Sequence, residues 1–135
     1  MIRKLEYFED QLKGSPLGRE VLKVLRHHAT EVMYLVQKNR PTMVCWNRNH
    51  GPRFIKSFVD SGFEMDVEFT REINGVKVET LLLSMAEVLQ DKGTPELKQT
   101  IGKYAAPVLE IARDASSLRD VIKRINNTHI VQRHD

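Results

Sequence analysis

Apolar residues recur at steps of three and four along most of the chain, which is the spacing of helices that bury one face. The longest stripe runs from Pro16 to Lys38, with Ser15 placed to cap its start and Pro41 placed to end it. Further stripes predict helices over residues 2–12, 52–62, 78–93, 95–112 and 118–125. We therefore expect about six helices.

Pro107 falls inside the apolar pattern of residues 95–112. A proline in a helix interior removes one backbone hydrogen bond, and its ring clashes with the preceding turn. We therefore expect a kink or a break in this helix between Tyr104 and Ala106.

A different pattern lies between residues 42 and 58. Residues 43–46 form an apolar run of strand-favouring composition that is too short to be a helix by itself. A polar stretch follows, and Gly51 lets the backbone turn before Pro52, which suits the first turn of a helix. The sequence therefore predicts a strand, a loop and a helix start.

Residues 63–70 alternate between apolar and polar side chains, a period of two that predicts a half-buried strand with an acidic outer face. Asn74 and Gly75 come next and are typical of a tight hairpin turn. Residues 76–78 then either pair back as a short strand or lead directly into the next helix.

Together these patterns predict an α+β protein that is mostly α, with a two- to three-stranded antiparallel sheet covered by helices. A chain of 135 residues is expected to form one domain. We place this domain at residues 1–126 and expect residues 127–135, which lack periodicity, to be a flexible tail. The free edge of a small sheet offers a natural place for two copies to meet.

The composition, 41% hydrophobic and 29% charged, is that of a globular protein. No apolar run approaches the length of a membrane helix, and the first residues lack the apolar core of a signal peptide. Cys45 is the single cysteine, so the chain contains no internal disulfide. We therefore expect a cytoplasmic protein without a membrane span.

The net charge of +3 is unevenly distributed. Residues 13–58 hold nine basic and two acidic residues, a balance of +7, which leaves −4 for the rest of the chain. Such a basic N-terminal half can face an acidic partner, a nucleic acid or the acidic half of a second copy. The alternative is an ordinary solvated surface.

The predicted strand–loop–helix, around residues 44–56, is a candidate site for an anion. A helix start presents free N–H groups and a partial positive charge. Arg48, His50 and Arg53 lie close to it in sequence, and Trp46 would flank the ligand. The stretch is not a P-loop, and these side chains could instead cap the turn.

Metal and nucleophile chemistry have weaker support. His27 and Glu31 are four residues apart on one helix, but they do not form a His-Glu-x-x-His motif, and we expect no metal and no cofactor. His28 falls on the apolar stripe and reads as a buried, hydrogen-bonded residue. Cys45 lies five residues before His50, yet its apolar surroundings are typical of a buried thiol rather than a nucleophile.

Glu64, Asp66 and Glu68 would share one face of the predicted strand. Paired carboxylates can perform acid–base chemistry, but their alternation with apolar residues indicates a solvated face. Their expected use is an acidic stripe that meets basic groups.

These observations favour a non-enzymatic protein-interaction or assembly module that is a homo-oligomer or binds another protein. One alternative is a binder of an anionic ligand or a nucleic acid at residues 44–56. Nucleic acid is the less expected ligand, because no binding motif is visible and because Glu20 and Glu31 offset Lys23 and Arg26. The second alternative is an enzyme that uses Cys45 and His50.

Overall fold

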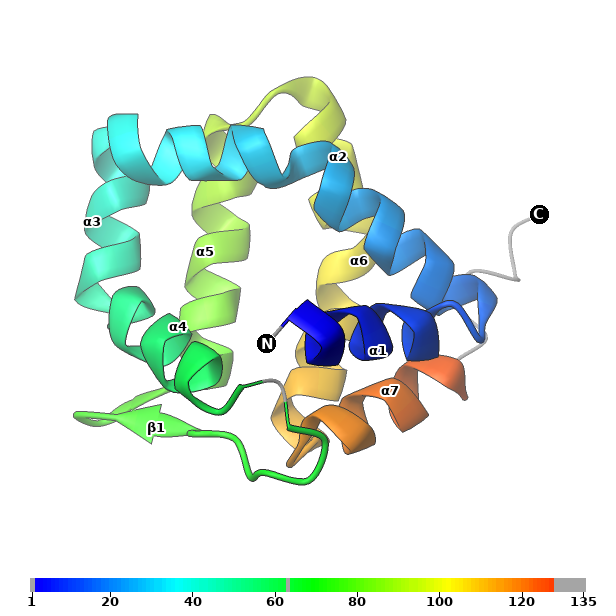
Figure 1. The fold of residues 1–135 in the computed structure, drawn as a ribbon. Coiled ribbons are helices and arrows are strands. Elements are labelled where there is room, and N and C mark those ends of the chain that lie inside the picture. The colour runs from blue at the N-terminus through cyan, green and yellow to red at the C-terminus, as the bar shows by residue number, and fades with distance from the viewer. Residues whose placement is uncertain (1, 63, 128–135) are drawn as a thin grey trace.

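The computed structural model describes residues 2–62 and 64–127, which form seven helices and one antiparallel sheet of two strands (Figure 1). The helices are α1 (Ile2–Leu12), α2 (Pro16–Lys38), α3 (Arg40–Arg48), α4 (Gly51–Asp60), α5 (Val78–Lys92), α6 (Pro95–Asp114) and α7 (Leu118–Asn126). The strands are β1 (Glu72–Ile73) and β2 (Val76–Lys77). The predicted class, α+β and mostly α, is confirmed. The predicted tail lies outside the described residues except for Asn127.

Hydroxyl side chains cap three of the helices, and Ser15 does so as predicted. The oxygens of Ser15, Thr94 and Ser117 each accept a hydrogen bond from the backbone N–H three residues later. These bonds satisfy N–H groups that have no partner inside the helix. The starts of α2, α6 and α7 are therefore fixed by local sequence.

The predicted strand over residues 43–46 is wrong, because these residues form the middle of α3. Asn39 caps this helix, and its side-chain oxygen accepts hydrogen bonds from Thr42 N at 3.1 Å and Thr42 Oγ1 at 2.8 Å. Pro41 then sits in the first turn, where a proline costs no hydrogen bond. Asn39 and Pro41, which end α2, therefore also start α3. This helix start outweighs the strand preference of residues 43–46.

The predicted strand over residues 63–70 is also wrong for its described part, residues 64–70, which form turns and an extended loop. Phe63 lies outside the described residues. The backbone N–H of Phe69 donates to Ser116 O at 2.8 Å, and the N–H of Arg119 donates to Met65 O at 3.0 Å. This loop therefore hydrogen-bonds to the connection between α6 and α7 and to the first turn of α7, and not to another strand.

The hairpin itself follows the sequence. Asn74 and Gly75 both have positive φ, 49° and 83°, which is the geometry of a tight turn between β1 and β2. Residues 76 and 77 form the returning strand, and the next helix begins immediately at Val78. Residues 76–78 therefore do both things that were expected of them: two of them pair back as a strand, and the third begins the next helix.

The predicted break near Pro107 is absent, because α6 runs without interruption from Pro95 to Asp114. The missing hydrogen bond is offset by packing on both sides of the proline. Leu97 and Tyr104 are buried before it, and Ile111 packs against buried residues after it.

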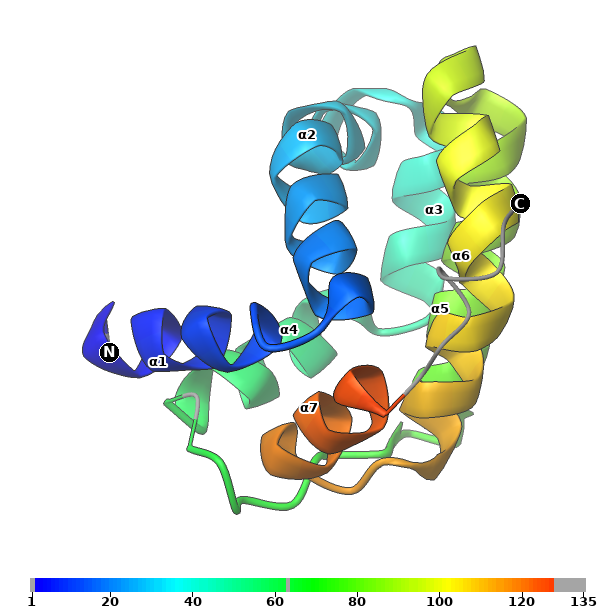
Figure 2. The ribbon, with the colours of Figure 1, turned by 90° about the vertical axis from the view of Figure 1, so that its right-hand side faces the viewer.

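The described part of the chain has two hydrophobic clusters instead of one continuous core. The first cluster joins α1, α2, α6 and α7, and consists of Leu12, Leu17, Leu22, Tyr104, Ile122 and Ile125. The second cluster joins α2, α4, α5 and α6, and consists of Leu35, Phe54, Leu81, Met85, Leu89 and Leu97. Helices α2 and α6 thus contribute to both clusters, and α5 lies alongside α6 (Figures 1 and 2).

None of the described helices combines the length and the apolar composition that a membrane span requires.

Candidate functional site

The four residues of the predicted anion site lie at the corner between α3 and α4. Arg48 ends α3, His50 adopts a left-handed backbone with φ 60°, and Arg53 lies in the first turn of α4. Both guanidinium groups are exposed, and neither forms an ion pair with a described residue. The backbone N–H of Arg53 donates to His50 O at 3.1 Å, but no described side-chain hydrogen bond links Arg48, His50 and Arg53 to one another, so the anion site stays a prediction.

Trp46 packs differently from this expectation. Its indole covers the backbone of Gly51 so closely that a Cβ atom there would lie 2.2 Å from ring carbon Cδ2. The ring also packs against the second cluster. Trp46 therefore joins α3 to α4, and it does not stand beside Arg48 as an open flank for a ligand.

Cys45 is half-buried, and this burial raises the pKa of its thiol, although Asn49 and Arg48 oppose the shift. The Asn49 amide donates to Cys45 O at 2.9 Å and lies 3.7 Å from the sulfur. No bond joins the thiol to His50. A nucleophile needs a lowered pKa and a nearby base, so this arrangement gives the enzyme hypothesis no support.

His27 and Glu31, four residues apart on α2, have different partners. His27 Nε2 lies 3.1 Å from Glu96 Oε2, while Glu31 Oε2 accepts a hydrogen bond from Thr94 N at 2.8 Å. Glu31 therefore helps to cap α6. His28 is buried as predicted, and its Nε2 lies 3.1 Å from the Thr100 hydroxyl. Among the described residues, no group of three or more His, Cys, Asp or Glu could hold a metal ion.

The predicted acidic stripe divides once its strand is lost. Asp66 forms a bidentate ion pair with Arg119, with oxygen–nitrogen distances of 2.7 Å and 3.1 Å. The hydrogen bonds from Arg119 hold the pKa of Asp66 below its ordinary range. Glu64 and Glu68 instead lie at the edge of a cavity.

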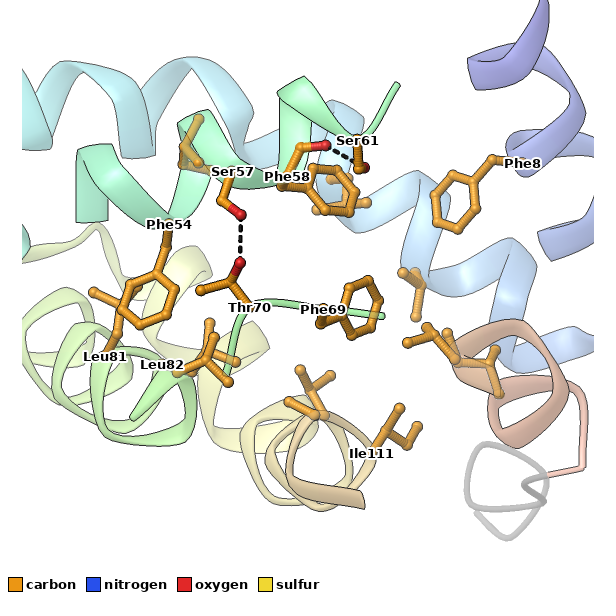
Figure 3. Close-up of a pocket in the computed structure, with 18 of the residues that line it drawn as sticks. Phe8, Phe54, Ser57, Phe58, Ser61, Phe69, Thr70, Leu81, Leu82 and Ile111 are labelled. Carbon is orange, nitrogen blue, oxygen red and sulfur yellow. Dashed lines mark hydrogen bonds between the residues drawn. The ribbon is translucent and has the colours of Figure 1, made fainter. Parts of the chain in front are cut away.

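This cavity has a volume of about 680 Å³ and lies between the two hydrophobic clusters. Residues of all seven helices contribute to its walls, as do residues 61, 64 and 67–70 after α4. Figure 3 shows part of this lining. From the first cluster, Leu12 and Leu17 reach the cavity, and from the second, Phe54 and Leu81 reach it. The cavity therefore occupies the place where a continuous core would have joined the two clusters.

The walls are mainly apolar, and their hydroxyl groups are already bonded. Ser57 Oγ and Thr70 Oγ1 lie 2.5 Å apart, and Ser61 Oγ donates to Phe58 O at 2.6 Å (Figure 3). The Tyr104 hydroxyl donates to Glu20 at 3.2 Å. Among the described residues, no lysine, arginine or histidine lines the cavity, and its charged lining residues are Asp60, Glu64 and Glu68. Such walls offer a ligand apolar contact and few polar groups.

Partly exposed apolar side chains also line this cavity, which opens to solvent. Ile55 is 51% exposed and Val108 is 41% exposed. Phe8 and Phe69 are half-buried, and Phe69 is 6.3 Å from Phe58 between ring centroids (Figure 3). Sequence reasoning missed this site, because hydrophobic periodicity identifies the inward face of a helix but not the distance to the opposite wall.

Comparison with protein-family models, curated proteins and solved structures finds no match for this chain. A function therefore has to be proposed from the geometry of the molecule alone.

Proposed function

We propose that the chain is a non-enzymatic binding module whose central cavity takes up an apolar ligand. The cavity of about 680 Å³ carries this proposal. Ligand pockets typically enclose about 300–1,000 Å³, with apolar walls and few polar groups. The described cavity has both the size and the composition of such a pocket.

The apolar surface that the open cavity leaves in contact with water supports this reading. Water entering through the mouth would find few hydrogen-bonding partners on the apolar part of the walls. An apolar ligand would displace this water and bury the exposed side chains at the mouth, and each buried CH₂ would contribute about 0.8 kcal/mol.

The shape of the cavity favours a small molecule over a helix of another protein. Helix-in-groove recognition uses an extended groove with anchors spread over two turns or more. Here residues from all seven helices line one cavity, so its walls enclose a site more than they form an extended groove. A flexible alkyl or ring compound fits this shape better.

A series of primary alcohols of increasing chain length tests the proposal. Each added methylene should improve binding about fourfold, because burying one CH₂ contributes about 0.8 kcal/mol. The affinity should stop rising once the alkyl chain of the alcohol fills the cavity. Competition against an environment-sensitive apolar dye measures the affinity of each alcohol. An affinity that is independent of chain length, or an absence of dye binding, would contradict the proposal.

A matched pair of variants ties the binding to this cavity. Val108→Trp adds an indole at the cavity wall, whereas Val44→Trp adds one to a similarly exposed position that does not line the cavity. We expect Val108→Trp to weaken alcohol binding at least tenfold and Val44→Trp to leave it unchanged. Equal effects of the two substitutions would place the binding elsewhere.

Protein interaction is the second candidate, and exposed apolar side chains on α2 favour it. Met33 is 60% exposed and Tyr34 is 61% exposed, and neither lines the cavity. A homodimer through this helix would have twice the mass of the 15.6 kDa chain in light scattering. Met33→Glu should then produce a monomer. A wild-type monomer at high concentration would rule out this assembly.

We also propose a cytoplasmic location. The single Cys45 is compatible with a reducing compartment, because it needs no disulfide partner.

A further inference from the structure

Basic side chains gather in a groove of about 500 Å³ on the N-terminal half of α2. Its lining consists of Leu22 and five basic residues, Lys13, Arg19, Lys23, Arg26 and His27. No acidic residue in the described part of the chain lines this basic groove. The groove is separate from the predicted anion site at Arg48 and Arg53, and none of its residues lines the apolar cavity.

The helix arranges three of these cations in a row. Arg19, Lys23 and Arg26 are spaced at i, i+4 and i+7, so they lie within about 60° of one another around the axis. The row extends about 10 Å along α2 at a rise of 1.5 Å per residue. The turn between α1 and α2 adds Lys13, whose carbonyl oxygen accepts a hydrogen bond from Arg19 Nη1 at 2.9 Å.

The acidic residues that were expected to offset this charge face α6 instead. The Glu20 carboxylate accepts from the Tyr104 hydroxyl, and the Glu31 carboxylate accepts from Thr94 N. The prediction that both offset Lys23 and Arg26 is therefore wrong.

Carboxylates do reach other members of the groove. Arg26 lies 3.5 Å from Glu9, Lys13 lies 3.6 Å from Asp10, and His27 lies 3.1 Å from Glu96. These pairs are exposed, and exposed pairs exchange readily for a stronger anionic partner. Arg19 and Lys23 form no ion pair with any described residue.

We propose that this basic groove binds the phosphodiester backbone of a nucleic acid without reading its sequence. Four permanent cations along one surface can neutralise several phosphates. No described Phe, Tyr or Trp lines the groove, and the His27 ring is engaged by Glu96 and His28, so base stacking, the usual source of single-strand affinity, has little support there. A lipid surface fits less well, because membrane-binding helices insert apolar side chains and Leu22 is buried.

The salt dependence of binding to a short mixed-sequence DNA duplex tests this proposal. Four phosphate contacts predict that raising the salt from about 50 to 200 mM weakens wild-type binding about 150-fold. Lys23→Ala/Arg26→Ala keeps two phosphate contacts, so its duplex binding should weaken only about 12-fold over the same range of salt. Its affinity at 50 mM salt should also fall at least tenfold. Fluorescence anisotropy with a labelled duplex measures both quantities.

Two further variants control for net charge and for folding. Lys38→Ala/Arg40→Ala removes one lysine and one arginine outside the groove, and it should retain the wild-type salt dependence. Lys23→Arg/Arg26→Lys keeps the charge of the row and should bind as the wild type does. Circular dichroism checks that each variant is folded.

Three results would overturn the proposal. The first is an equal loss in the two alanine pairs, which would mean that binding depends on net charge alone. The second is the absence of duplex binding at 50 mM salt. The third is binding to vesicles of phosphatidylcholine and phosphatidylserine that depends on Lys23 and Arg26 while duplex binding does not.

Discussion

Replacing Gly51 by alanine should destabilise the protein, because the first residue of α4 lies directly under the indole of Trp46. An added Cβ would lie 2.2 Å from Cδ2 and 2.3 Å from Cε3 of that ring, whereas real Cβ contacts stay beyond 3.0 Å. The ring would have to move by most of an ångström. It packs against the second cluster, so this movement would disturb buried neighbours.

Two opposing effects set the size of this loss. Overpacking of a well-packed site costs about 1–3 kcal/mol. Glycine to alanine by itself gains about 0.4–1 kcal/mol, because it restricts the unfolded chain. We therefore expect Gly51→Ala to lower the free energy of unfolding by about 1–2 kcal/mol.

Gly102→Ala provides the matched control within α6. Its Cβ would meet only the end of the flexible Gln90 side chain, at 3.2 Å, so the substitution should be neutral or stabilising. Urea unfolding followed by circular dichroism measures both variants. In a double-mutant cycle, Trp46→Leu should relieve the clash and give a coupling of about 0.5–3 kcal/mol with Gly51→Ala. A Gly51→Ala protein as stable as Gly102→Ala would refute the described packing.

Three other outcomes are expected. Ser15→Ala should lower the free energy of unfolding in urea by about 1 kcal/mol, because it removes the cap of α2. The Ser116 hydroxyl caps no described helix, so Ser116→Ala should change this free energy by less than about 0.5 kcal/mol. Arg119 lowers the pKa of Asp66, so this pair stabilises the fold at pH values above the ordinary aspartate pKa. That stability is lost as the pH falls through the lower pKa of Asp66 in the folded state. In Arg119→Gln, the free energy of unfolding should therefore depend less on pH in this range. Burial raises the pKa of Cys45, so iodoacetamide should label it slowly at neutral pH and faster after unfolding.

Local signals account for the parts of the fold that the sequence predicted. Ser15, Thr94 and Ser117 act on N–H groups three residues away, so their effect depends little on the rest of the chain. Asn74 and Gly75 fix the hairpin in the same way. Asn39 and Pro41 carried a second local signal, a helix start, which the strand composition of residues 43–46 obscured.

Features that depend on distant contacts could not be predicted in the same way. The alternating residues 64–70 lack a partner strand, so they hydrogen-bond to the connection between α6 and α7. The central cavity depends on how far the helices stand apart, which no spacing along the chain encodes. The basic groove is an intermediate case. The row of Arg19, Lys23 and Arg26 could have been found from angles around the helix, but Tyr104 and Thr94, the partners that turn Glu20 and Glu31 away, come from α6 and its cap.

The presence of two clusters has a consequence for how the molecule opens. Only α2 and α6 run through both clusters, so each half can lose protection from hydrogen exchange without the other half unfolding. Amides of α1 and α7 would then exchange at a rate distinct from those of α3 and α5. A compound bound in the cavity would touch both halves at once and bring the two rates together, so filling the cavity would turn two cooperative units into one.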